Sequence, residues 1–106
     1  MTELEFNQLS EQTFQQLESL LENTEGDIDF EMAGGNVLEI DCSGSKIIIN
    51  RQAAMQEMWV AARSGGFHYR WQEGAWRNTR DGSELISSLA GMIHAQCGAH
   101  LPLSLP

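Results

Sequence analysis

The sequence predicts an α+β fold, a two-layer sandwich in which two helices pack on one face of an antiparallel sheet of five or six strands. Three observations support this prediction. Both ends of the chain, at about 3–22 and 81–97, carry capping signatures followed by helical spacing of apolar residues. The segments between them alternate apolar and polar residues, which is typical of strands with one buried face. Short glycine-containing breaks separate these segments and favour an antiparallel meander.

The first helix is expected from about residue 3 to residue 22. Thr2 followed by Glu5 is a capping-box signature at its start. The side expected in the core carries Phe6, Leu9, Thr13, Leu17, Leu20 and Leu21. The other side carries Glu11, Glu18 and Glu22, whose spacings of seven and four place them on one face.

Strands are expected at 27–32, 37–42, 46–50, 55–62 and 67–72, with a short sixth piece around Trp76. In the first strand, Asp27, Asp29 and Glu31 point to one side and the apolar residues between them to the other. Ser43-Gly44 predicts a two-residue hairpin connection.

The second helix is predicted from the Asp81-Gly82-Ser83-Glu84 capping box, with Asp81 as the N-cap. Its buried side is expected to carry Leu85, Ile86, Leu89, Ile93 and Cys97, and Gly98 is a natural C′ residue. Each helix has one apolar stripe and each strand one apolar face. Both helices are therefore expected on the same side of the sheet, with the other side open to water.

Composition excludes several classes of protein. A chain of 106 residues forms a single domain, 1–106. The net charge of -9 excludes nucleic acid as a partner, because phosphates need a basic patch. No apolar run approaches the ~20 residues of a membrane span, and no secretion signal opens the chain. Two cysteines are too few for a disulfide framework, which favours a reducing cytoplasm.

The charge is distributed very unevenly. Residues 1–45 contain eleven of the fifteen acidic residues and no Lys or Arg, whereas residues 46–106 contain four acidic residues and all six bases. The local balances are therefore -11 and +2. A field of one sign attracts cations or basic partners.

The acidic residues near the first strand are candidate metal ligands: Glu18, Glu22, Glu25, Asp27, Asp29 and Glu31. We expect them to form one ridge, because the helix end and the strand start are only a few residues apart. Carboxylates suit iron, Mn²⁺, Mg²⁺ or Ca²⁺. No His or Cys accompanies them, so binding is expected to be weak. The alternative is a solvated charged face with no ligand.

Trp59 is the second candidate. If Met58 and Val60 face the core, Trp59 lies on the open face beside Asn50, Gln52, His68 and Arg70, where an exposed indole resembles a protein-binding hot spot. The alternative is a buried Trp59 on a bulged strand.

A third pattern, His94-x-x-Cys97-x-x-His100, has zinc-like spacing, but Cys97 falls on the apolar stripe and a fourth ligand is not evident. The sequence carries no phosphate-cradling glycine loop and no nucleophile-elbow motif, so we do not expect an enzyme.

Four stretches resemble the frataxin family, in its bacterial CyaY type: SKIIINRQ (45–52), MWVAA (58–62), SGGFHYRW (64–71) with Trp76, and DGSEL (81–85). The resemblance spans nearly the whole chain and includes the acidic helix and first strand. It implies a single frataxin-like domain in which the two helices are near-parallel.

The resemblance also implies a function. Members of the family are iron-binding accessory proteins of iron–sulfur cluster assembly that dock on the cysteine desulfurase and its scaffold protein. The resemblance assigns weak binding of iron, Fe²⁺ or Fe³⁺, to the six acidic residues. It assigns partner contacts to Asn50, Gln52 and Trp59. The expected protein is a cytoplasmic monomer that oligomerises with iron. The rival hypothesis is a metal-independent acidic adaptor that binds a basic patch on an enzyme.

Overall fold

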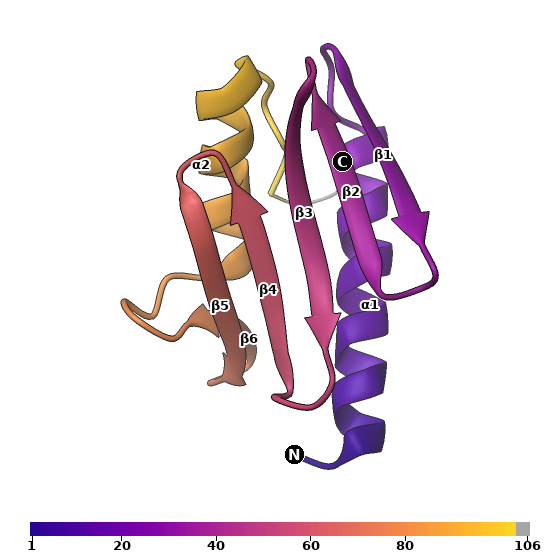
Figure 1. Cartoon of the computed structure of the whole chain (residues 1–106), viewed down its shortest axis with the longest axis vertical. Helices are drawn as coiled ribbons and strands as arrows, with labels where there is room; N and C mark the ends of the chain where they lie inside the picture. The colour runs from indigo at the N-terminus through magenta and orange to yellow at the C-terminus, as the bar shows by residue number, and fades with distance from the viewer. Residues whose placement is uncertain (104–106) are drawn as a thin grey trace.

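The computed structural model of the chain describes residues 1–103 and confirms the predicted architecture (Figure 1). Helices α1 (Glu3–Glu22) and α2 (Leu85–Cys97) flank six strands. The strands are β1 (Ile28–Ala33), β2 (Val37–Cys42), β3 (Ser45–Gln52), β4 (Glu57–Ala62), β5 (Gly65–Gln72) and β6 (Ala75–Asn78). Each strand pairs antiparallel with the next, so the order in the sheet is the order in the chain.

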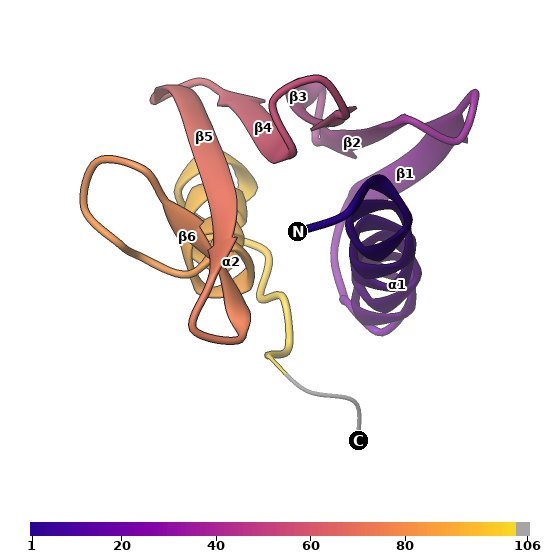
Figure 2. The same ribbon diagram turned by 90° about the horizontal axis from the view of Figure 1, so that it is seen from below.

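Both helices lie on the same side of the sheet, α1 toward β1 and α2 toward β5 (Figure 2). The core between the layers is built from the inward parity of each strand and one stripe of each helix. Its fully buried strand residues include Leu38, Ile40, Ile47, Ile49, Met58, Val60 and Tyr69. The residues of opposite parity are left on the open face. Within residues 1–103, neither helix has the length and apolarity needed to cross a bilayer.

Arg51 ties the β1–β2 hairpin to α1. It has the inward parity of β3 but lies at the rim of the core, where its guanidinium stands 5.6 Å from the centroid of the Phe14 ring. The same group donates hydrogen bonds to Ser10 Oγ at 3.0 Å and to the carbonyl of Gly35 in the β1–β2 turn at 2.6 Å. A charged side chain thus holds the hairpin that carries the acidic residues in place against the helix.

The start of α2 differs from the prediction. The N-cap is Glu84, not Asp81: its carboxylate accepts hydrogen bonds from the backbone N–H groups of Ile86 and Ser87. Asp81 instead accepts from the N–H and hydroxyl of Ser83, within the loop. Residues 79–81 form a turn, and the N–H of Asn78 donates to the carbonyl of Ser83 at 2.8 Å, which closes the loop back onto β6 and leaves Glu84 as the extended residue before the helix.

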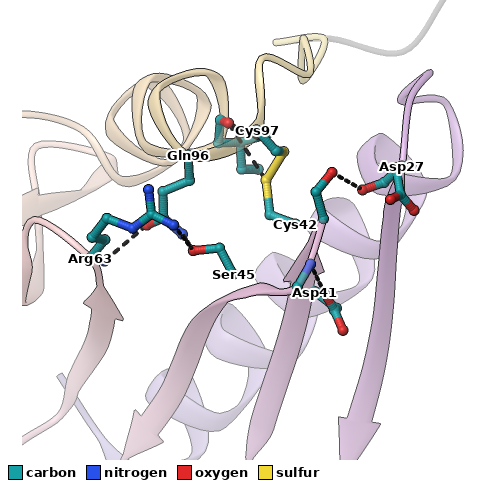
Figure 3. Close-up of a disulfide and its surroundings, with 10 residues drawn as sticks. Asp27, Asp41, Cys42, Ser45, Arg63, Gln96 and Cys97 are labelled. Atoms are coloured by element: carbon teal, nitrogen blue, oxygen red, sulfur yellow. Dashed lines mark hydrogen bonds between the residues drawn. A yellow bond between two sulfur atoms is a disulfide. The ribbon is translucent and has the colours of Figure 1, made fainter.

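The expectation of two reduced cysteines is also wrong. Cys42, the last residue of β2, and Cys97, the last residue of α2, form a disulfide (Figure 3). Their Cα atoms are 5.6 Å apart, within the range of about 4.4–6.8 Å that a disulfide requires. The sequence separation of 55 residues gave no sign of this proximity, which depends on how α2 docks against β2.

Trp76 closes the core by linking β6 to α1. It is only 3% exposed, and its ring meets those of Phe6 and Trp71 edge to face, with centroids 5.9 and 5.3 Å away. Its indole N–H donates to Thr13 Oγ1 at 2.8 Å, and the Thr13 hydroxyl donates in turn to the carbonyl of Leu9. Every polar atom at this contact is therefore satisfied inside the protein.

We predict that Thr13→Val lowers the free energy of unfolding by about 1–3 kcal/mol, because it leaves the buried indole N–H without an acceptor while changing little volume. Thr13→Ser keeps the hydroxyl and is the matched control, expected to cost less. Urea unfolding followed by Trp fluorescence measures both. Equal losses for the two variants would show that packing of the γ-methyl, and not the hydrogen bond, matters here.

Candidate functional site

The six predicted metal-binding carboxylates lie along the edge of the molecule formed by α1 and β1. Glu18 and Glu22 are on the last turns of α1, Glu25 and Asp27 are in the connection, and Asp29 and Glu31 are on β1. All are exposed except Glu18, which is half-buried. Because β1 is the edge strand of the sheet, no further strand covers this side of it.

The strand register adds two carboxylates that the prediction did not include. Asp29 pairs directly with Asp41 of β2, and Glu31 pairs with Glu39. Directly opposed side chains on one face of an antiparallel pair have Cβ atoms about 4.5–5.5 Å apart. The six predicted residues together with Glu39 and Asp41 are called the acidic edge below. The β1–β2 turn sets this register, and alternation alone does not reveal it.

Lys46 is a basic residue that contacts the acidic edge. It pairs with Asp41 across β2 and β3, and its Nζ stands 3.4 Å from Glu39 Oε1. Both side chains of this ion pair are well exposed, so its contribution to stability is small. Asp41 also has a structural role, because its Oδ1 accepts a hydrogen bond from the N–H of Gly44 in the β2–β3 turn at 2.7 Å. Asp29 and Glu31 carry no such partner in the described structure and lie farther from Lys46 in the strand order.

The acidic edge offers oxygen donors without a preformed coordination sphere. Within residues 1–103, no group of three or more His, Cys, Asp or Glu side chains is gathered around a point where a metal ion fits. An iron ion suits this donor set chemically, since carboxylates are hard ligands. It would be held here by one or two carboxylates, such as a cross-strand pair, with water completing its shell.

The second candidate surface lies on the open face of β3, β4 and β5. The predicted parity is confirmed: Met58 and Val60 are buried, and Trp59 is half-exposed on the open face. The register forms two rows across three strands, one of Asn50, Trp59 and His68 and the next of Gln52, Glu57 and Arg70. These six residues are called the Trp59 platform below, and they bring together the three predicted partner-binding residues Asn50, Gln52 and Trp59.

Glu57 organises the platform. It is only 2% exposed although it lies on the open face, because its neighbours cover it. Its Oε1 accepts a hydrogen bond from Trp59 Nε1–H at 2.8 Å, and its Oε2 accepts from Arg70 Nε and Nη2 at 3.0 and 2.6 Å. His68 stacks on Trp59, with ring centroids 4.4 Å apart and planes 10° from parallel, and its Nδ1 lies 3.4 Å from Glu57 Oε1.

The electrostatics of the platform favour a charged Glu57. Burial raises the pKa of Glu57, but the hydrogen bonds from Trp59 and Arg70 and the charges of Arg70 and His68 outweigh that effect. The net result is a pKa below the ordinary value. A carboxylate that is covered, charged and hydrogen-bonded on both oxygens fixes the indole in one orientation. The platform is therefore a preorganised surface, which lowers the entropic cost of binding a protein partner.

The zinc-like pattern at the end of α2 does not form a metal site. Cys97 is bonded to Cys42, so its sulfur is not available as a thiolate ligand. The rings of His94 and His100 lie close together, with centroids 4.8 Å apart, and both residues are exposed. Two imidazoles without a third donor are not a zinc site.

Comparison with known proteins assigns most of the chain to one domain type. The family model described as the frataxin-like domain matches residues 1–99. This range contains both candidate surfaces and the whole of α2.

Individual relatives agree with the family model. The iron–sulfur cluster assembly protein CyaY of Dechloromonas aromatica is 46% identical over 104 residues, covering 97% of this chain and 99% of the relative. The protein of the same name from Herminiimonas arsenicoxydans is 50% identical over 109 residues, covering 97% and 96%. The solved structure of frataxin from Psychromonas ingrahamii superposes with a TM-score of 0.90 at 30% identity, covering 99% of this chain and all of the other.

We predict that Glu57→Gln lowers the free energy of unfolding by roughly 1–3 kcal/mol at neutral pH, because it removes the charge from a covered, hydrogen-bonded carboxylate. The folded pKa is depressed, so this stabilisation is present above the unfolded value of about 4.3 and is lost as the pH falls through the folded pKa. The difference between wild type and variant should therefore shrink in acid. Urea unfolding across this pH range measures it.

Glu73→Gln, which removes an exposed charge in the β5–β6 turn, is the control and should change stability little. A difference between wild type and Glu57→Gln that stays constant down to low pH would contradict a charged Glu57 as the organising group.

Proposed function

We propose, from the premise that this chain belongs to the frataxin-like domain family, that it is an iron-binding accessory protein of iron–sulfur cluster assembly in the bacterial cytoplasm. The observation that carries the proposal is that the strand carboxylates of the acidic edge, Asp29, Glu31, Glu39 and Asp41, share the open face of one sheet with the preorganised Trp59 platform. It acts through binding, as iron donor, as iron-dependent regulator of the desulfurase–scaffold complex, or as both. We propose no catalytic role.

The acidic edge is proposed to hold Fe²⁺ or Fe³⁺ weakly through carboxylate oxygens. Cross-strand carboxylates such as Asp29 and Asp41 supply hard donors, and the absence of a preformed sphere in residues 1–103 supports low affinity and poor selectivity among divalent cations. Weak binding suits a protein that must release iron. We propose that the protein is a monomer, and that iron shared between the acidic edges of two copies promotes oligomers.

The Trp59 platform is proposed to contact the cysteine desulfurase and its scaffold protein. Neighbouring rows of the open face connect the two surfaces: Glu39 lies in the row of Ile48 and Ala61, which is next to the row of Asn50, Trp59 and His68. A single partner with a basic patch and an apolar pocket can therefore touch both. The acidic edge would speed encounter through long-range attraction, and Trp59 would supply binding energy at the centre.

The alternative is a metal-independent acidic adaptor, in which the same edge only contacts a basic patch on the enzyme. Lys46 favours the adaptor, because its ammonium group lies beside Glu39 and Asp41 and shows that this edge can pair with a basic side chain. The two candidates differ in whether iron changes the affinity for the partner.

Titration of the protein into the desulfurase–scaffold complex, with and without Fe²⁺ under anaerobic conditions, separates them. Trp59→Ala should weaken binding about thirtyfold in both conditions, as for a hot-spot aromatic worth ~2 kcal/mol. Asp29→Asn combined with Glu31→Gln should remove the effect of iron while leaving the contribution of Trp59. Met55→Ala, which truncates an exposed side chain outside the platform, is the control. Identical titrations with and without Fe²⁺ would favour the adaptor.

We also predict that Asp29→Asn is neutral or stabilising without metal and lowers iron affinity. Asp29 faces Asp41 in the folded sheet, and the unfolded chain can separate these charges. The melting temperature at low salt should rise by roughly 0–4 °C. High salt should raise that of wild type more than that of the variant, because exposed like charges are screened. A variant that melts below wild type at low salt without metal would show that Asp29 has a structural partner.

A further inference from the structure

The Cys42–Cys97 disulfide lies beside the loop that carries part of the acidic edge, next to Asp27 (Figure 3). That loop, residues 23–27, joins α1 to β1 and includes Glu25 and Asp27. A residue that closely follows each cysteine in the chain contacts this loop. The disulfide is therefore placed to influence how firmly the loop is held.

On the sheet side, the contact is made by the residue after Cys42. Ser43 donates two hydrogen bonds to the carbonyl of Asp27, from its N–H at 3.0 Å and from its hydroxyl at 3.2 Å. On the helix side, the contact is made by the segment after Cys97. Ala99 is 7% exposed and packs against Gly26. A Cβ added to Gly26 would lie 3.6 Å from the Cβ of Ala99. Residues 23–27 are thus held between two segments that the disulfide joins.

The last turn of α2 has a second attachment that does not involve sulfur. Gln96 Nε2 donates to Ser45 Oγ at 2.7 Å, and Gln96 Oε1 accepts from the N–H of Arg63 at 2.9 Å. These bonds hold the helix to β3 and to the β4–β5 connection (Figure 3). Neither bond involves a sulfur atom, so neither depends on the disulfide.

The two sulfur atoms differ in access. Cys42 is fully buried, whereas Cys97 is half-buried at the end of a helix. An external thiolate reaches Cys97 Sγ first. A dithiol reductant forms a mixed disulfide there and expels Cys42 as a thiolate, which takes up a proton. The second thiol of the reductant then displaces Cys97, so that two electrons and two protons pass to the protein and the reductant leaves as its own disulfide.

We propose that the Cys42–Cys97 disulfide is a reversible redox modification site, opened by dithiol reductants, whose state sets how firmly the acidic loop 23–27 and the chain after α2 are held. Disulfides in a reducing cytoplasm are usually transient or redox-sensing, which agrees with this role. This comparison with cytoplasmic disulfides rests on the proposed cytoplasmic location. The disulfide site itself does not depend on the proposal that the protein binds iron. The oxidised form holds the loop on both sides, and the reduced form holds it through Ser43 alone.

The test compares oxidised and reduced protein without denaturant. Excess dithiothreitol is added, free thiols are alkylated and counted by mass spectrometry, and amide hydrogen exchange is measured in both states. We expect both cysteines to become alkylated together. Exchange should accelerate at least about tenfold in residues 23–27 and 98–103, because a cross-link has been removed from a local opening unit. Exchange in β4 should change little and serves as the internal reference. Cys42→Ser combined with Cys97→Ser should match reduced wild type in both buffers.

Three results would overturn the proposal. Thiols that react only after denaturant is added would mean a permanent structural bond. Equal exchange in the two redox states would mean that the bond does not hold the loop. Acceleration of the same size in β4 would mean global destabilisation instead of local release. None of these outcomes depends on metal or on a partner, so they leave the proposed function untouched. The wild-type comparison also stands if the double variant does not fold.

Discussion

One-sided coverage of the sheet is the constraint on which the rest of this structure depends. Every strand from β2 to β5 buries one parity of side chains under α1 and α2, and the opposite parity must then tolerate water. On the covered side, the contact between Trp76 and Thr13 is one where the indole N–H and the hydroxyl both find acceptors inside the protein. Because the helices occupy the other face, the surfaces available for binding lie on the uncovered face and its edges.

The uncovered face handles charge in two different ways. On the Trp59 platform, Glu57 is covered and its two oxygens accept hydrogen bonds from Trp59 and Arg70, so the charge is compensated and the geometry fixed. On the acidic edge, Asp29 and Glu31 face other carboxylates across the strands, and repulsion is only partly relieved by Lys46. A carboxylate whose charge is balanced by its neighbours gives a fixed surface that suits recognition of a protein. Carboxylates that repel one another gain stability when a cation binds between them. The two surfaces occupy neighbouring rows of the same face.

Local pattern was enough to predict most of the fold. Alternation located the strands and assigned Trp59 to the open face, and capping and periodicity located α1, since both signals depend on residues close in sequence. Contacts between distant residues were missed. Glu84 replaces Asp81 as N-cap because the loop from Asn78 is closed first. The pairing of Cys42 with Cys97 depends on helix docking, which leaves no local trace in the sequence.

The candidate site was predictable to the same extent. The six acidic residues were predicted from their charge, their spacing on the helix and strand, and the resemblance, but Glu39 and Asp41 joined them only through the β1–β2 register. Likewise, Asn50, Gln52 and Trp59 were found from parity and resemblance, while the central position of Glu57 was not. Its role depends on its partner Arg70, thirteen residues away on the next strand. Nothing in the sequence around Glu57, between Gln56 and Met58, indicates that its side chain will be covered.

We propose that cations bind the acidic edge and that protein partners bind the Trp59 platform. Backbone amide NMR during anaerobic addition of Fe²⁺ tests this proposal most directly, because a paramagnetic ion broadens signals close to where it binds. We expect the strongest broadening in residues 18–31 with residues 39 and 41, and much weaker broadening at His68 and Arg70, which lie on β5, three strands away from Glu39. Broadening centred on Trp59 and His68, or on His94 and His100, would contradict it.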